Sequence, residues 1–124
     1  MNVVDSSAWL EYFADGGNAR HFAPSIENTD TLLVPSLALG EVFRTVLAQR
    51  GEGDALQAAA IMEQGTVIDL NRALALEAAR LSQELSLPMT SSIMLATAWT
   101  HGAAFWTQDA NFDQVDGVRY YPKR

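Results

Sequence analysis

The chain has 124 residues, of which 48% are hydrophobic and 19% are charged, and these proportions predict one globular domain over residues 1–124. It has no cysteine, which excludes a disulfide framework, a Cys-based zinc site and a thiol nucleophile. Its net charge of −7 argues against a broad basic face for nucleic acids, but it is compatible with a small nuclease whose acids gather in one metal site. No apolar run approaches the roughly 20 residues of a membrane span. Without a signal-peptide pattern either, we expect no membrane association and a cytoplasmic location.

The start of the chain predicts a short buried strand that leads directly into a helix. Residues 3–4 are a β-branched pair, and Ser6 or Ser7 is expected to cap a helix that runs to Phe13. Asp5 then lies at the C-terminal end of the first strand. In open α/β sheets, this is the edge where ligands bind.

The rest of the chain alternates between further strands and helices. The other expected strands are 31–34, 65–70, 103–107 and 118–121. The other expected helices are 18–28, 37–49 capped by Ser36, 54–62, 72–85 capped by Asn71, and 93–100 after a loop over 87–92, with Thr90, Ser91 or Ser92 as its cap. This alternation predicts a three-layer α/β/α domain with a mostly parallel sheet of four to five short strands. Right-handed crossovers would then bring all the strand ends to one edge.

Three acids are expected at that edge, namely Asp5, Glu41 in the first turns of a helix, and Asp109 after the fourth strand. Carboxylates that are packed together repel and raise one another's pKa. A hard divalent cation such as Mg²⁺ or Mn²⁺ resolves the repulsion, and it can activate water and stabilise a phosphoryl transition state. The pattern therefore points to metal-dependent phosphodiester hydrolysis. On position alone, an ordinary solvated acid is an equally good interpretation of Glu41.

Other chemistries of a strand-end aspartate fit less well. A phosphotransferring aspartate of the haloacid-dehalogenase type needs a second acid two residues later, where this chain has Ser7. A receiver-type phosphoacceptor needs further acids near the first strand and a lysine late in the sheet, and both are absent. Nucleotide binding would need a glycine-rich loop after a strand, which is also absent.

Several segments together resemble one known family. Val-Val-Asp-Ser-Ser-Ala-Trp-Leu-Glu-Tyr-Phe at 3–13 looks like the opening of PIN-domain proteins, specifically of VapC-type toxins of type II toxin–antitoxin systems. Val-Pro-Ser at 34–36 with Glu-Val-Phe at 41–43 resembles the second acidic segment of that family. Residues 95–98 and 106–112 resemble its C-terminal half, so the likeness covers essentially the whole chain.

The resemblance implies a PIN-like α/β/α fold and a Mg²⁺- or Mn²⁺-dependent endoribonuclease that cuts RNA. It also implies a homodimer and a cognate antitoxin whose tail reaches into the acidic pocket. Asp5, Glu41 and Asp109 match the acids of the family and would hold the metal and orient water. Thr107 matches the hydroxyl residue that precedes the last acid, and Ser7 is expected to support the site with it. Arg44 and Arg50 would lie near the dimer interface or the RNA groove.

One departure from the family pattern concerns the metal site. The family has an aspartate where this chain has Ser91, and often an acid where it has Asn111. Serine can still cap a helix, but it removes a charged ligand, and this loss should weaken metal binding. Water, the Ser91 hydroxyl, or one of the expected surface acids Asp113 and Asp116 would have to replace the missing ligand. The alternative function is therefore a catalytically weakened PIN domain that acts mainly by binding an antitoxin or RNA.

Overall fold

In the computed structural model, which describes residues 1–124, five short strands form one parallel sheet in the order β3-β2-β1-β4-β5. The strands are β1 (Asn2–Val4), β2 (Leu32–Pro35), β3 (Thr66–Ile68), β4 (Ala104–Thr107) and β5 (Arg119–Tyr120). β1 lies in the middle, where Val3 pairs with Leu33 on one side and Phe105 on the other. Val3 is fully buried, as expected for a strand that is covered on both faces.

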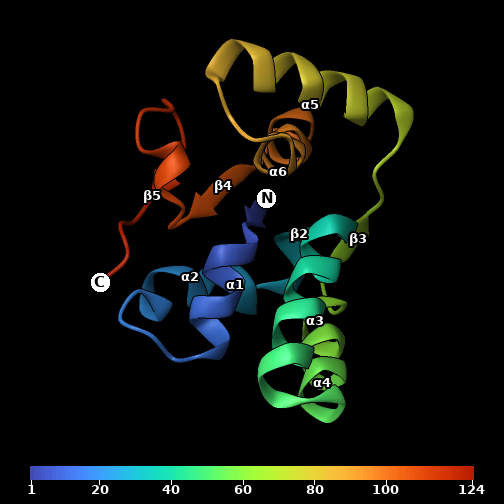
Figure 1. Cartoon of the computed structure of the whole chain (residues 1–124), viewed down its shortest axis with the longest axis vertical. Coiled ribbons are helices and arrows are strands. Elements are labelled where there is room, and N and C mark those ends of the chain that lie inside the picture. Colours follow the sequence, from blue (N-terminus) through green and yellow to red (C-terminus); the bar gives the residue numbers. More distant parts are fainter.

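Helices cover both faces of this sheet (Figure 1). The α-helices are α1 (Ser6–Phe13), α2 (Ala19–Glu27), α3 (Ser36–Arg50), α4 (Glu52–Met62), α5 (Arg72–Leu85) and α6 (Met89–Thr100), and the two 3₁₀ turns are η1 (Thr29–Thr31) and η2 (Ala110–Phe112). α6 packs on β1, β2 and β4, and α5 packs on α6, whereas α1 and α2 lie on the opposite face. α3 and α4 pair as a hairpin that extends away from the sheet. The expected three-layer α/β/α fold with a parallel sheet is confirmed, and no helix is long and apolar enough to cross a membrane.

α6 is the helix most deeply enclosed by the fold. Every residue from Ser91 to Ala98 is buried, because α5 covers one side of α6 and the sheet covers the other. The small residues of this helix suit such close packing. The hydroxyl of Thr97, which would otherwise be buried without a partner, donates to the carbonyl oxygen of Ile93 at 2.8 Å.

The structure corrects the expected caps of α1 and α3 and confirms that of α5. Neither Ser6 nor Ser7 caps α1, because the N-cap is Asp5 itself, whose Oδ1 accepts the Ser6 backbone N–H at 2.9 Å. Ser36 is the first residue of α3 rather than its cap, and Pro35 takes the N-cap position. Asn71 caps α5 as predicted, and its Oδ1 accepts the backbone N–H of Leu74 at 2.9 Å.

Two helices also begin earlier than the sequence pattern predicts. The expected loop over 87–92 is wrong in its second half, because α6 starts at Met89 with Pro88 as its N-cap. Thr90, Ser91 and Ser92 therefore lie inside the first turns, and none of them is a cap. Their short polar side chains hid the helical period. α4 likewise begins at Glu52, directly after Gly51, whose φ of 92° lets the chain reverse between two helices.

Candidate active site

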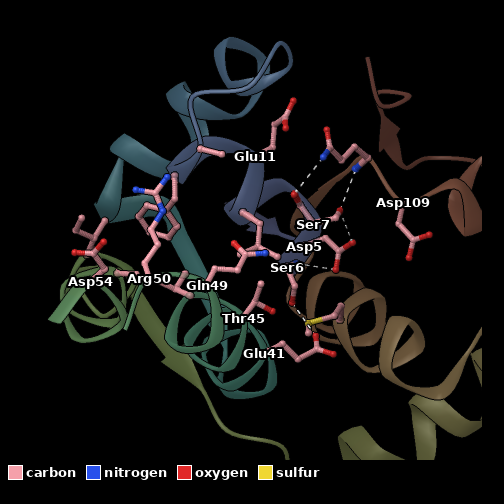
Figure 2. A pocket seen from close by; sticks show the side chains of 18 of the residues that line it. Asp5, Ser6, Ser7, Glu11, Glu41, Thr45, Gln49, Arg50, Asp54 and Asp109 are labelled. Atoms are coloured by element: carbon pink, nitrogen blue, oxygen red, sulfur yellow. Dashed lines mark hydrogen bonds between the residues drawn. The ribbon is translucent and has the colours of Figure 1, made fainter. Parts of the chain in front are cut away.

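A cleft of about 790 Å³ opens beyond the carboxyl ends of β1 and β4 (Figure 2). Its walls come from α1, α3, α4 and the start of α6, together with the residues that follow β4. Asp5, Glu41 and Asp109 all line it, as do Ser7 and Ser91. The fold therefore brings the expected acids to one cleft, because parallel strands end at the same edge of the sheet.

Asp5 is the most deeply buried acid of the cleft, with 6% of its surface exposed. Its Oδ2 accepts hydrogen bonds from the hydroxyls of Thr107 at 2.7 Å and Ser7 at 3.1 Å, which gives both supporting residues a physical role. Burial raises the pKa of Asp5 to about 6, against the effect of these hydroxyls and of the Ser6 N–H, and the charge of Asp109 raises it slightly further. Asp5 is consequently a carboxyl group that titrates close to neutral pH.

Glu41 and Asp109 are each fixed through one oxygen. Oε1 of Glu41 accepts the hydroxyl of Ser6 at 2.8 Å, so α1 and α3 are joined directly beside Asp5. Oδ1 of Asp109 accepts the backbone N–H of Asn111 at 2.9 Å, and the Asp109 N–H donates to the Thr107 hydroxyl at 3.0 Å. The second oxygen of both acids has no donor within the chain. Because a carboxylate oxygen accepts about two hydrogen bonds, Oδ1 of Asp5, with one donor, also keeps spare capacity.

The donor set fits an open cation site rather than a closed one. No group of three or more His, Cys, Asp or Glu side chains lies close enough to enclose a metal ion. However, Mg²⁺ usually binds through one or two carboxylates, water and substrate phosphate. Asp5 and Asp109 would supply such a pair, because the Thr107 hydroxyl donates to the Asp5 carboxylate and accepts the Asp109 backbone N–H, and the charge of Asp109 raises the pKa of Asp5. Ser91 adds a hydroxyl that forms no hydrogen bond within the chain.

Other polar residues of the region divide into those at the cleft and those away from it. Asp113 and Asp116 are exposed and do not line it. The sequence analysis assigned no role at the site to Ser6, whose hydroxyl donates to Glu41. Its position directly after a strand-end acid could have indicated that it lies at the site. Gln108 was also missed, and its backbone N–H donates to the Ser7 hydroxyl at 3.3 Å. Arg50 lines the cleft at the end away from Asp109 (Figure 2).

The comparisons with known proteins identify the class of this domain. The family model of the PIN domain matches residues 3–118, and the chain therefore belongs to the PIN-domain family. Among curated proteins, none matches the chain.

Solved structures share its fold over nearly their whole length. A toxin–antitoxin complex from Klebsiella pneumoniae is similar with a TM-score of 0.78 and 20% identity over 95% of both chains. VapC20 of Mycobacterium tuberculosis, described as a sarcin–ricin loop cleaving toxin, has a TM-score of 0.76 and 17% identity over 96% of this chain and 98% of its own. VapBC2 of Rickettsia felis, solved on a DNA fragment from its promoter, has a TM-score of 0.73 and 12% identity, covering 98% and 97%.

Proposed function

We propose that this chain is a divalent-metal-dependent endoribonuclease, the toxin of a toxin–antitoxin pair, which hydrolyses RNA phosphodiesters in the acidic cleft. The observation that carries the proposal is that three acids of a PIN domain line one cleft, and each has an oxygen with spare acceptor capacity. Its fold neighbours include a toxin that cleaves the sarcin–ricin loop and a toxin–antitoxin complex. The place of action would be the cytoplasm.

In this reaction the side chains would bind the metal, position Asp5 and orient the attacking water. Asp5 and Asp109 would hold Mg²⁺ or Mn²⁺, with Glu41 and Ser91 reaching it directly or through water. When bound, such a cation supplies positive charge at the scissile phosphate and acidifies water. The hydroxyls of Thr107 and Ser7 favour the ionised form of Asp5 and fix its rotamer, because both donate to its Oδ2. The free oxygens of Glu41 and Asp109 would accept hydrogen bonds from the attacking water and so orient it.

RNA cleavage by the purified protein tests this proposal. We expect fragments of a structured RNA to form in the presence of Mn²⁺, and none in excess EDTA or with Asp5→Asn. Asp113→Asn is the matched control, because it removes the same charge at an exposed position outside the cleft. Cleavage that survives Asp5→Asn would refute the assignment of the site, since that substitution removes the buried carboxylate.

The second candidate is a catalytically weakened PIN domain that acts by binding. Ser91 favours it, because this cleft residue stands where the family resemblance implies a fourth carboxylate, and no three acids form a compact group. The variant Ser91→Asp separates the two candidates. If the chain is an active nuclease, the substitution should change cleavage little. A large gain of cleavage would support the weakened domain.

The proposed partners also have support in the structure. Five acids and two cations line the cleft, which suits a basic segment of an antitoxin. On the α3–α4 hairpin, Leu47 is 42% exposed and Leu56 is 55% exposed, and these side chains would be covered if the hairpin formed a homodimer interface. Sedimentation analysis of the free protein, and of the protein with its co-encoded partner, would test both assemblies.

A further inference from the structure

The last four residues of the chain are anchored to the body of the domain next to the cleft. The backbone N–H of Tyr121 donates to the carbonyl oxygen of Thr107 at 2.9 Å. The Tyr121 ring stacks on His21 with the ring centroids 4.2 Å apart and the planes at 12°, and it lies parallel to Trp106 at 6.3 Å. This segment therefore enters the cleft region from a fixed point at the end of β4.

The second anchor is Asn18, a buried residue with 1% of its surface exposed. Its Nδ2 donates to the carbonyl oxygen of Pro122 at 2.8 Å and to Oε1 of Gln108 at 3.1 Å. Its Oδ1 accepts Nε of Arg124 at 3.1 Å. Asn18 thus holds the segment on both sides of residue 123 and also contacts Gln108, whose N–H is bonded to the Ser7 hydroxyl.

Gly17 provides the space that this arrangement requires. A Cβ at this position would lie 3.0 Å from Cδ and 3.4 Å from Cβ of Arg124, so the aliphatic part of Arg124 lies directly against the glycine backbone. The backbone N–H of Asn18 donates to Oε2 of Glu11 at 2.9 Å, which fixes the loop beneath. These contacts hold the backbone in place on both sides of residue 123, so the point from which that side chain extends is fixed.

That side chain is Lys123, the only lysine of the chain. It lines the cleft together with Asp5 and Asp109, and only one other cation, Arg50, does so. Lys123 has no ion pair, since the single salt bridge of the chain joins Arg80 to Glu77. A cation that is held at an acid-lined cleft but is paired with none of its acids is available for an anion.

We propose that Lys123 binds a phosphate of the RNA substrate next to the scissile one, and that Asn18 is the positioning residue that holds Lys123 there. This inference rests on the proposed nuclease function and deepens it. An RNA strand that enters a cleft with five acids is repelled unless cations offset them, and an exposed ammonium suits a phosphate as a compact point charge. Fixing the backbone on both sides reduces the ordering cost of that contact.

Cleavage kinetics on a short single-stranded RNA test the inference. Lys123→Ala should raise KM about tenfold with kcat nearly unchanged, since a charge-assisted bond is lost from binding. It should also make the logarithmic salt dependence of kcat/KM shallower by about 0.7, the contribution of one phosphate contact on a single strand. Lys123→Arg should restore both values. Arg20→Ala, which removes one exposed charge outside the cleft, is the matched control and should change neither beyond a small general effect.

Asn18 is tested through its coupling to Lys123. Asn18→Ala should raise KM and reduce the salt slope, and adding it to Lys123→Ala should have little further effect, because both act through one contact. Gly17→Ala is the second variant if Asn18→Ala does not fold: its Cβ would displace the Arg124 side chain and weaken the bond of Arg124 to Asn18, so KM should rise and the salt slope should fall in the same direction. The ¹³C-methylated side chain of the single lysine gives a direct NMR signal that should shift on adding RNA.

The outcomes separate this inference from the function on which it rests. If the wild-type protein does not cleave RNA with any divalent cation, the proposed function fails and Lys123 has no such substrate. If the wild-type protein cleaves RNA but Lys123→Ala matches Arg20→Ala in KM and salt slope, the inference is overturned and the nuclease assignment stands.

Discussion

Replacing Asp5 by Asn should stabilise the metal-free protein near neutral pH. Burial raises the pKa of Asp5 from 3.8 to about 6, so the folded state binds this proton more tightly than the unfolded state does. Stability therefore falls as pH rises from about 4 to about 6, and above that range the charged carboxylate costs about 3 kcal/mol. Asn removes the charge and keeps the cap on α1 through its amide oxygen, while its amide nitrogen takes the position of Oδ2 and donates to the Thr107 and Ser7 hydroxyls, which rotate to accept. It loses about 0.3–1 kcal/mol of interaction with the helix dipole. The net gain should be about 2 kcal/mol.

Urea denaturation at about pH 8 and about pH 4, in EDTA, measures this difference. Asp5→Asn should be more stable than wild type by about 2 kcal/mol at the higher pH, and most of the advantage should disappear at the lower one, where Asp5 is protonated in the folded state and about half protonated in the unfolded state. Asp113→Asn is exposed and should show no comparable gain. An Asp5→Asn protein that is less stable than wild type at about pH 8 would refute the claim that burial dominates at this position.

Three further substitutions follow from the same contacts. Thr107→Val removes a hydroxyl that lowers the pKa of Asp5, so the rise of cleavage with pH should move to higher pH; an unchanged profile would exclude this hydrogen bond as an influence. Asn71→Ala removes the side-chain cap of α5 and should cost about 1 kcal/mol in urea denaturation while leaving kcat unchanged, since the cap is remote from the cleft. Leu56→Glu should shift the protein towards monomer in sedimentation if the α3–α4 hairpin is the dimer interface, and a dimer of unaltered affinity would locate the interface elsewhere.

The alternation of strands and helices could be predicted because each element carries its own local pattern. A β-branched pair followed by a lone acid placed Asp5 at the end of β1, and the hydrophobic run before Asp109 placed that acid after β4. Once both strands are parallel neighbours, their ends meet, so a shared cleft followed from topology alone. The region of the candidate site was therefore accessible from the sequence.

The errors lie where local patterns are ambiguous or where contacts span the chain. The hydroxyl-rich stretch before Ile93 gave no helical period, because every residue from Ser91 to Ala98 is buried, whether apolar or polar, and Ser92 and Thr97 donate back to carbonyl oxygens one turn earlier. Two features could not be predicted: the hydrogen bond between Ser6 and Glu41, and the contact of the last residues of the chain with Asn18. Both join residues that are far apart in the sequence, so no local pattern indicates them.

Calorimetric titration of Mn²⁺ into the purified, antitoxin-free protein tests the central claim most directly. Asp5, Glu41 and Asp109 line one cleft without forming a compact cluster, and the proposal requires that these three acids suffice for a working cation site. It predicts micromolar binding by the wild-type chain, loss of that binding in Asp5→Asn, and its retention in Ser91→Asp. Binding by Ser91→Asp alone would contradict the proposal and would mark the chain as a PIN domain that acts through its partners.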